Sequence, residues 1–109
     1  MLTTLAAGWV YQFSHAVGQS ILTGPGFHFP TALAIGRNDV VYVVNRSDES
    51  NVGPRISKMT IGGPEEEEFI CEFGTYGDGD GHSIWASSVA LDREENVYVS
   101  DESLHRISI

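Results

Sequence analysis

The sequence contains one pattern of residues twice, and this internal repeat restricts the folds open to the chain. At an offset of 56 residues, Val41-Tyr42-Val43 falls on Val97-Tyr98-Val99. Farther along, Arg55-Ile56-Ser57 matches Arg106-Ile107-Ser108 at an offset of 51, so the loop of the first unit is five residues longer. Repeats of about 40–50 residues are typical of propellers and solenoids. Because each unit consists of short runs of β-branched and aromatic residues, the repeat favours a propeller.

Turn residues divide each unit into segments with the length and composition of β-strands. Residues 1–8 are interpreted as a loose leader. The expected strands are residues 9–13 ahead of the repeat, 31–35, 40–44, 55–61 and 68–73 in the first unit, and 88–92, 96–101 and 106–109 in the second. We therefore expect an all-β fold, in which one outer strand precedes a four-stranded antiparallel sheet and three strands of a second sheet.

The unit resembles the NHL repeat of β-propellers, clearly over residues 27–109 and more weakly over residues 9–26. In the first unit the resemblance depends on Phe29-Pro30, 32–35, 41–45 and Arg55-Ile56. Their counterparts in the second unit are Trp85, 88–92, 96–101 and Arg106-Ile107. The glycine-rich passage 73–81 between the units also belongs to the pattern. Two positions depart from the pattern. Ala86 stands where the first unit has Pro30, and Asn45 stands where the family usually has Asp.

The resemblance implies one domain, residues 1–109, built as a two-blade segment of a propeller that usually has six four-stranded blades. Residues 9–28 would be an outer strand and inter-blade loop, 29–83 the first blade and the next loop, and 84–109 a second blade without its outer strand. Two blades cannot close a ring, and such repeats need at least about three units for stability. We therefore expect either the remainder of a longer propeller or a homo-oligomer, of which a trimer is favoured.

Composition excludes several classes of partner. The formal net charge is −9, and the six Lys and Arg residues are scattered, which argues against nucleic-acid binding. No apolar run approaches the roughly 20 residues of a membrane span. The first residues lack the basic segment of a signal peptide, so we expect a soluble chain whose compartment the sequence does not indicate. The single cysteine, Cys71, is expected to be a small strand residue.

Candidate binding residues gather in the loops of one predicted rim. In a four-stranded blade, the inter-blade loops and the loops between second and third strands share a rim, and all four histidines fall there. The candidate ligand-binding residues are His15, His28, His82, His105, Asp78 and Asp80, and Asp48 and Glu49 fall on the same rim. Imidazole and carboxylate groups can bind a divalent metal. Loops are also where His and Asp occur in general, and the spacing of a true zinc site is missing.

Other charged residues are expected to be structural. Arg55 and Arg106 recur in both units, so we expect them to pack between blades and to hydrogen bond Asn45 or Asp101 in the same repeat. The four glutamates at 65–68 are interpreted as a solvated turn that guards a sheet edge.

Two functions stay open at this point. The first is a non-enzymatic binding or interaction module that needs no cofactor. The second, implied by the resemblance to six-bladed propellers, is a metal-dependent lyase or lactone hydrolase. No nucleophile motif and no phosphate-binding loop is present, so no catalytic residue is assigned.

Overall fold

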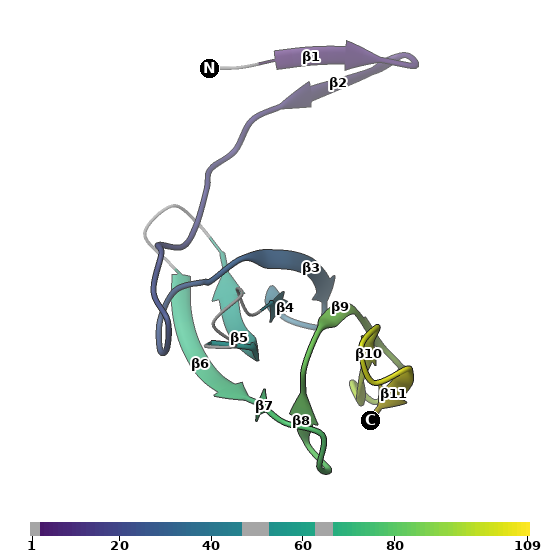
Figure 1. The fold of residues 1–109 in the computed structure, drawn as a ribbon. Helices are drawn as coiled ribbons and strands as arrows, with labels where there is room; N and C mark the ends of the chain where they lie inside the picture. Colours follow the sequence, from purple (N-terminus) through teal and green to yellow (C-terminus); the bar gives the residue numbers. More distant parts are fainter. Residues whose placement is uncertain (1–2, 47–52, 63–66) are drawn as a thin grey trace.

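The computed structural model describes residues 3–46, 53–62 and 67–109, and these residues form an all-β fold without a helix. Accordingly, the described chain contains no helix that is long and apolar enough to cross a membrane. Two antiparallel sheets form the body of the molecule, and a separate hairpin stands away from them (Figure 1). Neither sheet closes on itself. The all-β prediction is therefore confirmed, whereas the number of blades and their arrangement in a propeller stay predictions.

The first sheet has four strands in sequential order, β3-β4-β5-β6, each antiparallel to the next. Asn38 and Asp39 have positive φ angles of 56° and 61° in the β3–β4 turn, a conformation that Asn and Asp tolerate better than most residues. The strands lie within two residues of their predicted bounds. They are β3 (Pro30–Ile35), β4 (Val40–Asn45), β5 (Arg55–Ile61) and β6 (Glu67–Phe73).

The second sheet has three strands in the order β11-β10-β9. They are β9 (Ala86–Leu91), β10 (Val97–Asp101) and β11 (Arg106–Ser108). The passage between the sheets contains a short parallel pair, β7 (Thr75–Tyr76) and β8 (His82–Ser83), where the sequence predicts only a loop. Strands of two residues carry too few side chains to produce a periodic pattern, so this pair leaves no signal in the sequence.

The interpretation of residues 1–8 as a loose leader is wrong. Strand β1 (Thr3–Ala6) pairs with β2 (Trp9–Gln12) in an antiparallel hairpin. Its two turn residues, Ala7 and Gly8, both have positive φ, as the tightest hairpin turns require. Consequently β2 has a partner on its N-terminal side and is not the lone outer strand that the sequence analysis expects.

Each sheet has two distinct faces. We call the side that carries Tyr42 in the first sheet, or Tyr98 in the second, the tyrosine face. The side that carries Val41 in the first sheet, or Val97 in the second, is the valine face. Side chains alternate between these faces along each strand, so neighbouring positions belong to opposite sides.

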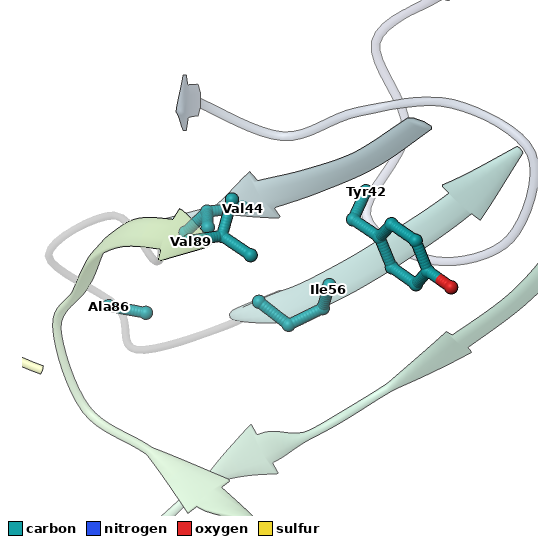
Figure 2. Packing of buried hydrophobic residues seen from close by; sticks show 5 residues of the cluster. All are labelled: Tyr42, Val44, Ile56, Ala86 and Val89. Carbon is teal, nitrogen blue, oxygen red and sulfur yellow. The ribbon is translucent and has the colours of Figure 1, made fainter. Parts of the chain in front are cut away.

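The main core lies between the two sheets. Tyr42, Val44 and Ile56 on the tyrosine face of the first sheet pack against Ala86 and Val89 of the second (Figure 2). The edge strand β9 of the second sheet lies beside both β3 and β4 (Figure 1). The tyrosine face of one sheet is therefore covered by the valine face of the next.

A smaller core lies on the other side of the first sheet. Val41, Val43 and Met59 on its valine face form a cluster with Val17 and Phe27 from the segment that leads into β3. This segment covers only part of the face, because large apolar side chains on β3 remain exposed there.

Candidate functional site

The loops with the candidate residues meet at one end of the sheets. In the first sheet, Pro30 pairs with Asn45 and Asn45 pairs with Arg55, so the segment before β3 and the β4–β5 connection share this end. In the second sheet, Asp101 pairs with both Ala86 and Arg106 at the corresponding end. We call it the arginine end, after Arg55 and Arg106.

Arg55 holds the loop that precedes the first sheet. The guanidinium group is 4% exposed and lies among backbone carbonyl oxygens. Nη1 donates to Leu22 (2.7 Å) and Gly53 (3.2 Å), and Nη2 donates to Ile21 (3.1 Å) and Gly26 (3.0 Å). Nε lies 2.9 Å from Oε2 of Glu72. Burial lowers the pKa of Arg55, and the Glu72 carboxylate opposes this by stabilising the charged form.

Arg106 does the same for the loop that precedes the second sheet. It donates to the carbonyl oxygens of Asp78 (2.9 Å), Gly79 (2.8 Å) and His82 (3.2 Å). Asp78 and His82 lie 56 residues after Leu22 and Gly26, so both arginines bind equivalent carbonyls. The structural role predicted for the two arginines is confirmed. The predicted hydrogen bond between Arg55 and Asn45 is present, but it uses the Arg55 backbone carbonyl oxygen (3.3 Å), while each guanidinium group binds a loop.

Asn45 and Asp101 fix the entry into each sheet. The Oδ1 atom of Asn45 accepts a hydrogen bond from the His28 N–H (2.9 Å), and Oδ2 of Asp101 accepts one from the Ile84 N–H (2.7 Å), 56 residues later. Burial raises the pKa of Asp101, but four backbone N–H groups donate to its carboxylate and outweigh this effect, so the pKa is lowered. These donors belong to Ile84, Trp85, Ser103 and Leu104.

Three of the four candidate histidines lie at the arginine end. The ring of His28 contacts that of Phe29 edge to face, with centroids 4.7 Å apart. The Nδ1 atom of His82 lies 2.7 Å from Oγ1 of Thr75. His105 occupies the turn between β10 and β11 with a positive φ of 53°. Their rings therefore have separate surroundings.

The fourth histidine is in a different place. His15 pairs with the Ser14 hydroxyl (2.7 Å) and lies three residues before Gly18. The Gly18 N–H donates to Glu67, which pairs with Ile61 at the end of the first sheet opposite Arg55. The structure thus does not bring His15 to the arginine end.

The acidic candidates form no cluster with the histidines. Asp78 and Asp80 are exposed, and Asp78 accepts a hydrogen bond from Arg106 through its backbone carbonyl oxygen. Across residues 3–46, 53–62 and 67–109, no group of three His, Cys, Asp or Glu side chains is placed to hold a metal ion. The candidates Asp48 and Glu49 and the first two glutamates of the run 65–68 lie outside the described residues.

The sequence analysis missed a stack of aromatic rings on one cation. The Arg46 guanidinium carbon lies 4.6 Å from the centroid of the Trp85 ring and 5.9 Å from that of Phe29. Phe29 and Trp85 are equivalent in the two units, but Arg46 corresponds to Glu102, so the repeat gives no signal for the contact. Together with the half-buried His28, these residues form a polar and aromatic surface at the arginine end, on which Phe29 is exposed and Arg46 and Trp85 are half-buried.

A hollow of about 490 Å³ at this end is open to solvent. Arg55, Glu72, Phe73 and Tyr76 contribute to its wall. A second cavity of about 120 Å³ lies between the sheets, beside Arg55, His82 and Asp101. This volume is below the roughly 300–1,000 Å³ of typical small-molecule pockets. The charged groups beside it are already engaged in structural hydrogen bonds.

The two sheets are also joined at the opposite end. The Glu95 carboxylate accepts hydrogen bonds from the Arg37 backbone N–H and from the Tyr42 hydroxyl (3.4 Å), and it lies 4.0 Å from Nε of Arg37. Arg37 in turn donates to the carbonyl oxygen of Arg93. An ionic contact therefore accompanies the apolar contact between sheets.

No protein-family model matches this sequence, and the curated proteins compared with it give no match. The resemblance to NHL repeats consequently stays a prediction.

Proposed function

We propose that the chain is a two-blade segment of an NHL-type β-propeller and that it acts as a binding scaffold. One observation carries this proposal: the 56-residue repeat extends into the backbone hydrogen bonds of the loops. The Ile21 N–H donates to Phe27, and the Gly77 N–H donates to Ser83, at the same offset. The parallel bridge between Ser20 and Phe27 likewise corresponds to the pairing of β7 with β8.

Such a repeat supports a propeller because each unit reproduces both a sheet and the connection to the next sheet. The first strands of the two sheets, β3 and β9, lie beside each other, as the innermost strands of successive blades would. If the movement that carries the first sheet onto the second were repeated, it would place further sheets around an axis.

The arginine end supports binding more than catalysis. Arg55, Arg106 and Asp101 are engaged in holding loops. The surface that remains is the stack of Phe29, Arg46 and Trp85. Aromatic residues and arginine are enriched in protein interfaces. We infer that this stack contacts a protein or peptide partner.

Selection of peptides on the immobilised chain tests this role. Peptides selected from a random display library should lose most of their affinity for Phe29→Ala, while Ile70→Ala, an exposed apolar change on β6, serves as the control. Selected peptides that bind both variants equally well would contradict a binding surface at Phe29.

The alternative is a metal-dependent lyase or lactone hydrolase, which the resemblance to six-bladed propellers implies. Elemental analysis of the purified chain separates the two. A stoichiometric divalent metal that disappears in both His28→Ala and His82→Ala, but persists in His15→Ala, would favour the enzyme. A metal content well below one ion per chain in all variants agrees with the binding scaffold.

A further inference from the structure

Two sheet faces of the described chain lack a covering sheet, and both expose large apolar side chains. Ile56 on the tyrosine face of the first sheet is 5% exposed, but its counterpart Ile107 in the second is 68% exposed. On the valine face the order is reversed. Val89 in the second sheet is 8% exposed, and its counterpart Leu33 in the first is 60% exposed.

The contact between the sheets shows what each bare face can bind. Ile56 is buried because the valine face of a following sheet covers it, and Val89 is buried because the tyrosine face of a preceding sheet covers it. The bare tyrosine face carries Ile107 and Tyr98, and the bare valine face carries Leu33 and Ile35. The uncovered part of the valine face lies along β3, because Val17 and Phe27 already cover Val41 and Val43. This part and the bare tyrosine face expose apolar side chains at positions that are buried between the two sheets.

The charged contact at the edge of the interface can be repeated as well. Glu95 binds the Arg37 backbone and the Tyr42 hydroxyl across the sheets. At an offset of 56, Arg37 corresponds to Arg93 and Glu95 corresponds to Asp39. Asp39 and Glu95 also share the same positive φ of 61°. Arg93 on one bare face and Asp39 on the other are thus of opposite charge at matching positions.

We propose that the tyrosine face of the second sheet in one copy of the chain packs on the valine face of the first sheet in another copy. This inference rests on the propeller geometry proposed above, since it repeats the contact between the two sheets. The interface joins two different surfaces, so it is heterologous, and successive copies add head to tail until a ring closes. A C2 dimer with the same patch on both sides would not use this pairing.

Two variants with one blocked face each provide the test. Leu33→Asp blocks the valine face and Ile107→Asp blocks the tyrosine face, and both side chains are exposed in the single chain, so both variants should keep the wild-type circular dichroism spectrum. Sedimentation should show that the wild-type chain self-associates. Each variant alone should associate about 100-fold more weakly, because a carboxylate replaces a buried apolar side chain.

Mixing the two variants gives the sharpest result. Each still has one intact face, so an equimolar mixture should form a one-to-one dimer with wild-type affinity and no larger species. Ile70→Asp, on the outer strand β6, is the matched control and should associate as the wild type does. A mixture that stays monomeric would overturn the inference, and so would a wild-type chain that is monomeric at every concentration.

The charged pair offers an independent check. Asp39→Arg and Arg93→Asp should each weaken association by up to about fivefold, as expected for an exposed ion pair. Combining both changes in one chain should restore the association of the wild type. If the double variant associates more weakly than either single variant, the predicted pairing is wrong. A monomeric wild-type chain would leave the binding scaffold intact, because that proposal is tested by peptide binding and metal content.

Discussion

Replacing Arg55 with lysine tests how much of the fold depends on the guanidinium contact with residues 21–26. The two terminal nitrogens of Arg55 donate four hydrogen bonds to backbone carbonyls, and Nε lies 2.9 Å from the Glu72 carboxylate. Lysine keeps the charge but has all its donors on a single nitrogen. It therefore cannot satisfy carbonyl oxygens that two separate nitrogens reach.

The expected loss follows from the number of bonds that lysine fails to make. Hydrogen bonds to charged groups contribute about 1.5–3 kcal/mol each, so losing two of the four would cost roughly 3–6 kcal/mol. Some of the released carbonyls can turn toward water, which reduces the expected loss to about 2–4 kcal/mol. The matched change, Arg106→Lys, affects three bonds at an exposed site, and we expect about 1 kcal/mol there.

Urea unfolding followed by far-ultraviolet circular dichroism measures both losses. The measurement is made at two protein concentrations, because association between chains would make the urea midpoint depend on concentration. The effect of association can then be separated from the stability of the single chain. The reasoning predicts a larger loss for Arg55→Lys than for Arg106→Lys. Equal losses, or a loss below about 1 kcal/mol for Arg55→Lys, would refute the view that the buried guanidinium group holds the first loop.

Three further changes test single contacts. The pKa of Asp101 is lowered in the folded chain, so its carboxylate stabilises the fold fully above the pKa of an unfolded Asp, near 4, and this stabilisation disappears as the pH falls. Asp101→Asn should therefore reduce the drop in urea midpoint that acid causes. Arg46→Ala should shift the fluorescence of Trp85, whose ring the guanidinium group covers, and cost about 0.5–1 kcal/mol in urea unfolding. Asn45→Asp should destabilise the chain by about 2 kcal/mol or more, because a buried carboxylate cannot donate the bonds that the amide gives to the carbonyl oxygens of Arg55 and Val43; an unchanged urea midpoint would contradict this.

The sequence could predict most of the strands because the evidence for them is local. Val41 to Val44 and Val97 to Val99 are dense in β-branched residues, and turn residues flank them. Strand β1 was missed because Thr3 to Ala6 is short and weakly apolar, and its pairing depends on the Ala7-Gly8 turn. The local turn, and not the composition of the strand, decides such a case.

The candidate site was less predictable for a different reason. Spacing can assign a histidine to a loop, but it does not give the direction of the ring. His82 is drawn to the Thr75 hydroxyl within its own loop, and His28 turns its ring toward Phe29. The contact between Arg46 and Trp85 joins residues that are far apart in sequence and occurs in only one unit. A repeat therefore reveals scaffold residues more readily than residues that differ between its copies.

Asn45 and Asp101 show how one structural task is solved with different chemistry. In the second unit the chain turns directly after Asp101, and the Ser103 and Leu104 N–H groups donate to the carboxylate (both 3.0 Å). In the first unit, the Asn45 amide donates instead to the Ser57 hydroxyl (2.9 Å) and to the Arg55 carbonyl oxygen (3.3 Å). A carboxylate suits a position surrounded by donors, and an amide suits a position that also faces acceptors. Asn at position 45, where the second unit has Asp101, therefore matches its acceptors, and both side chains anchor the entry to their sheet.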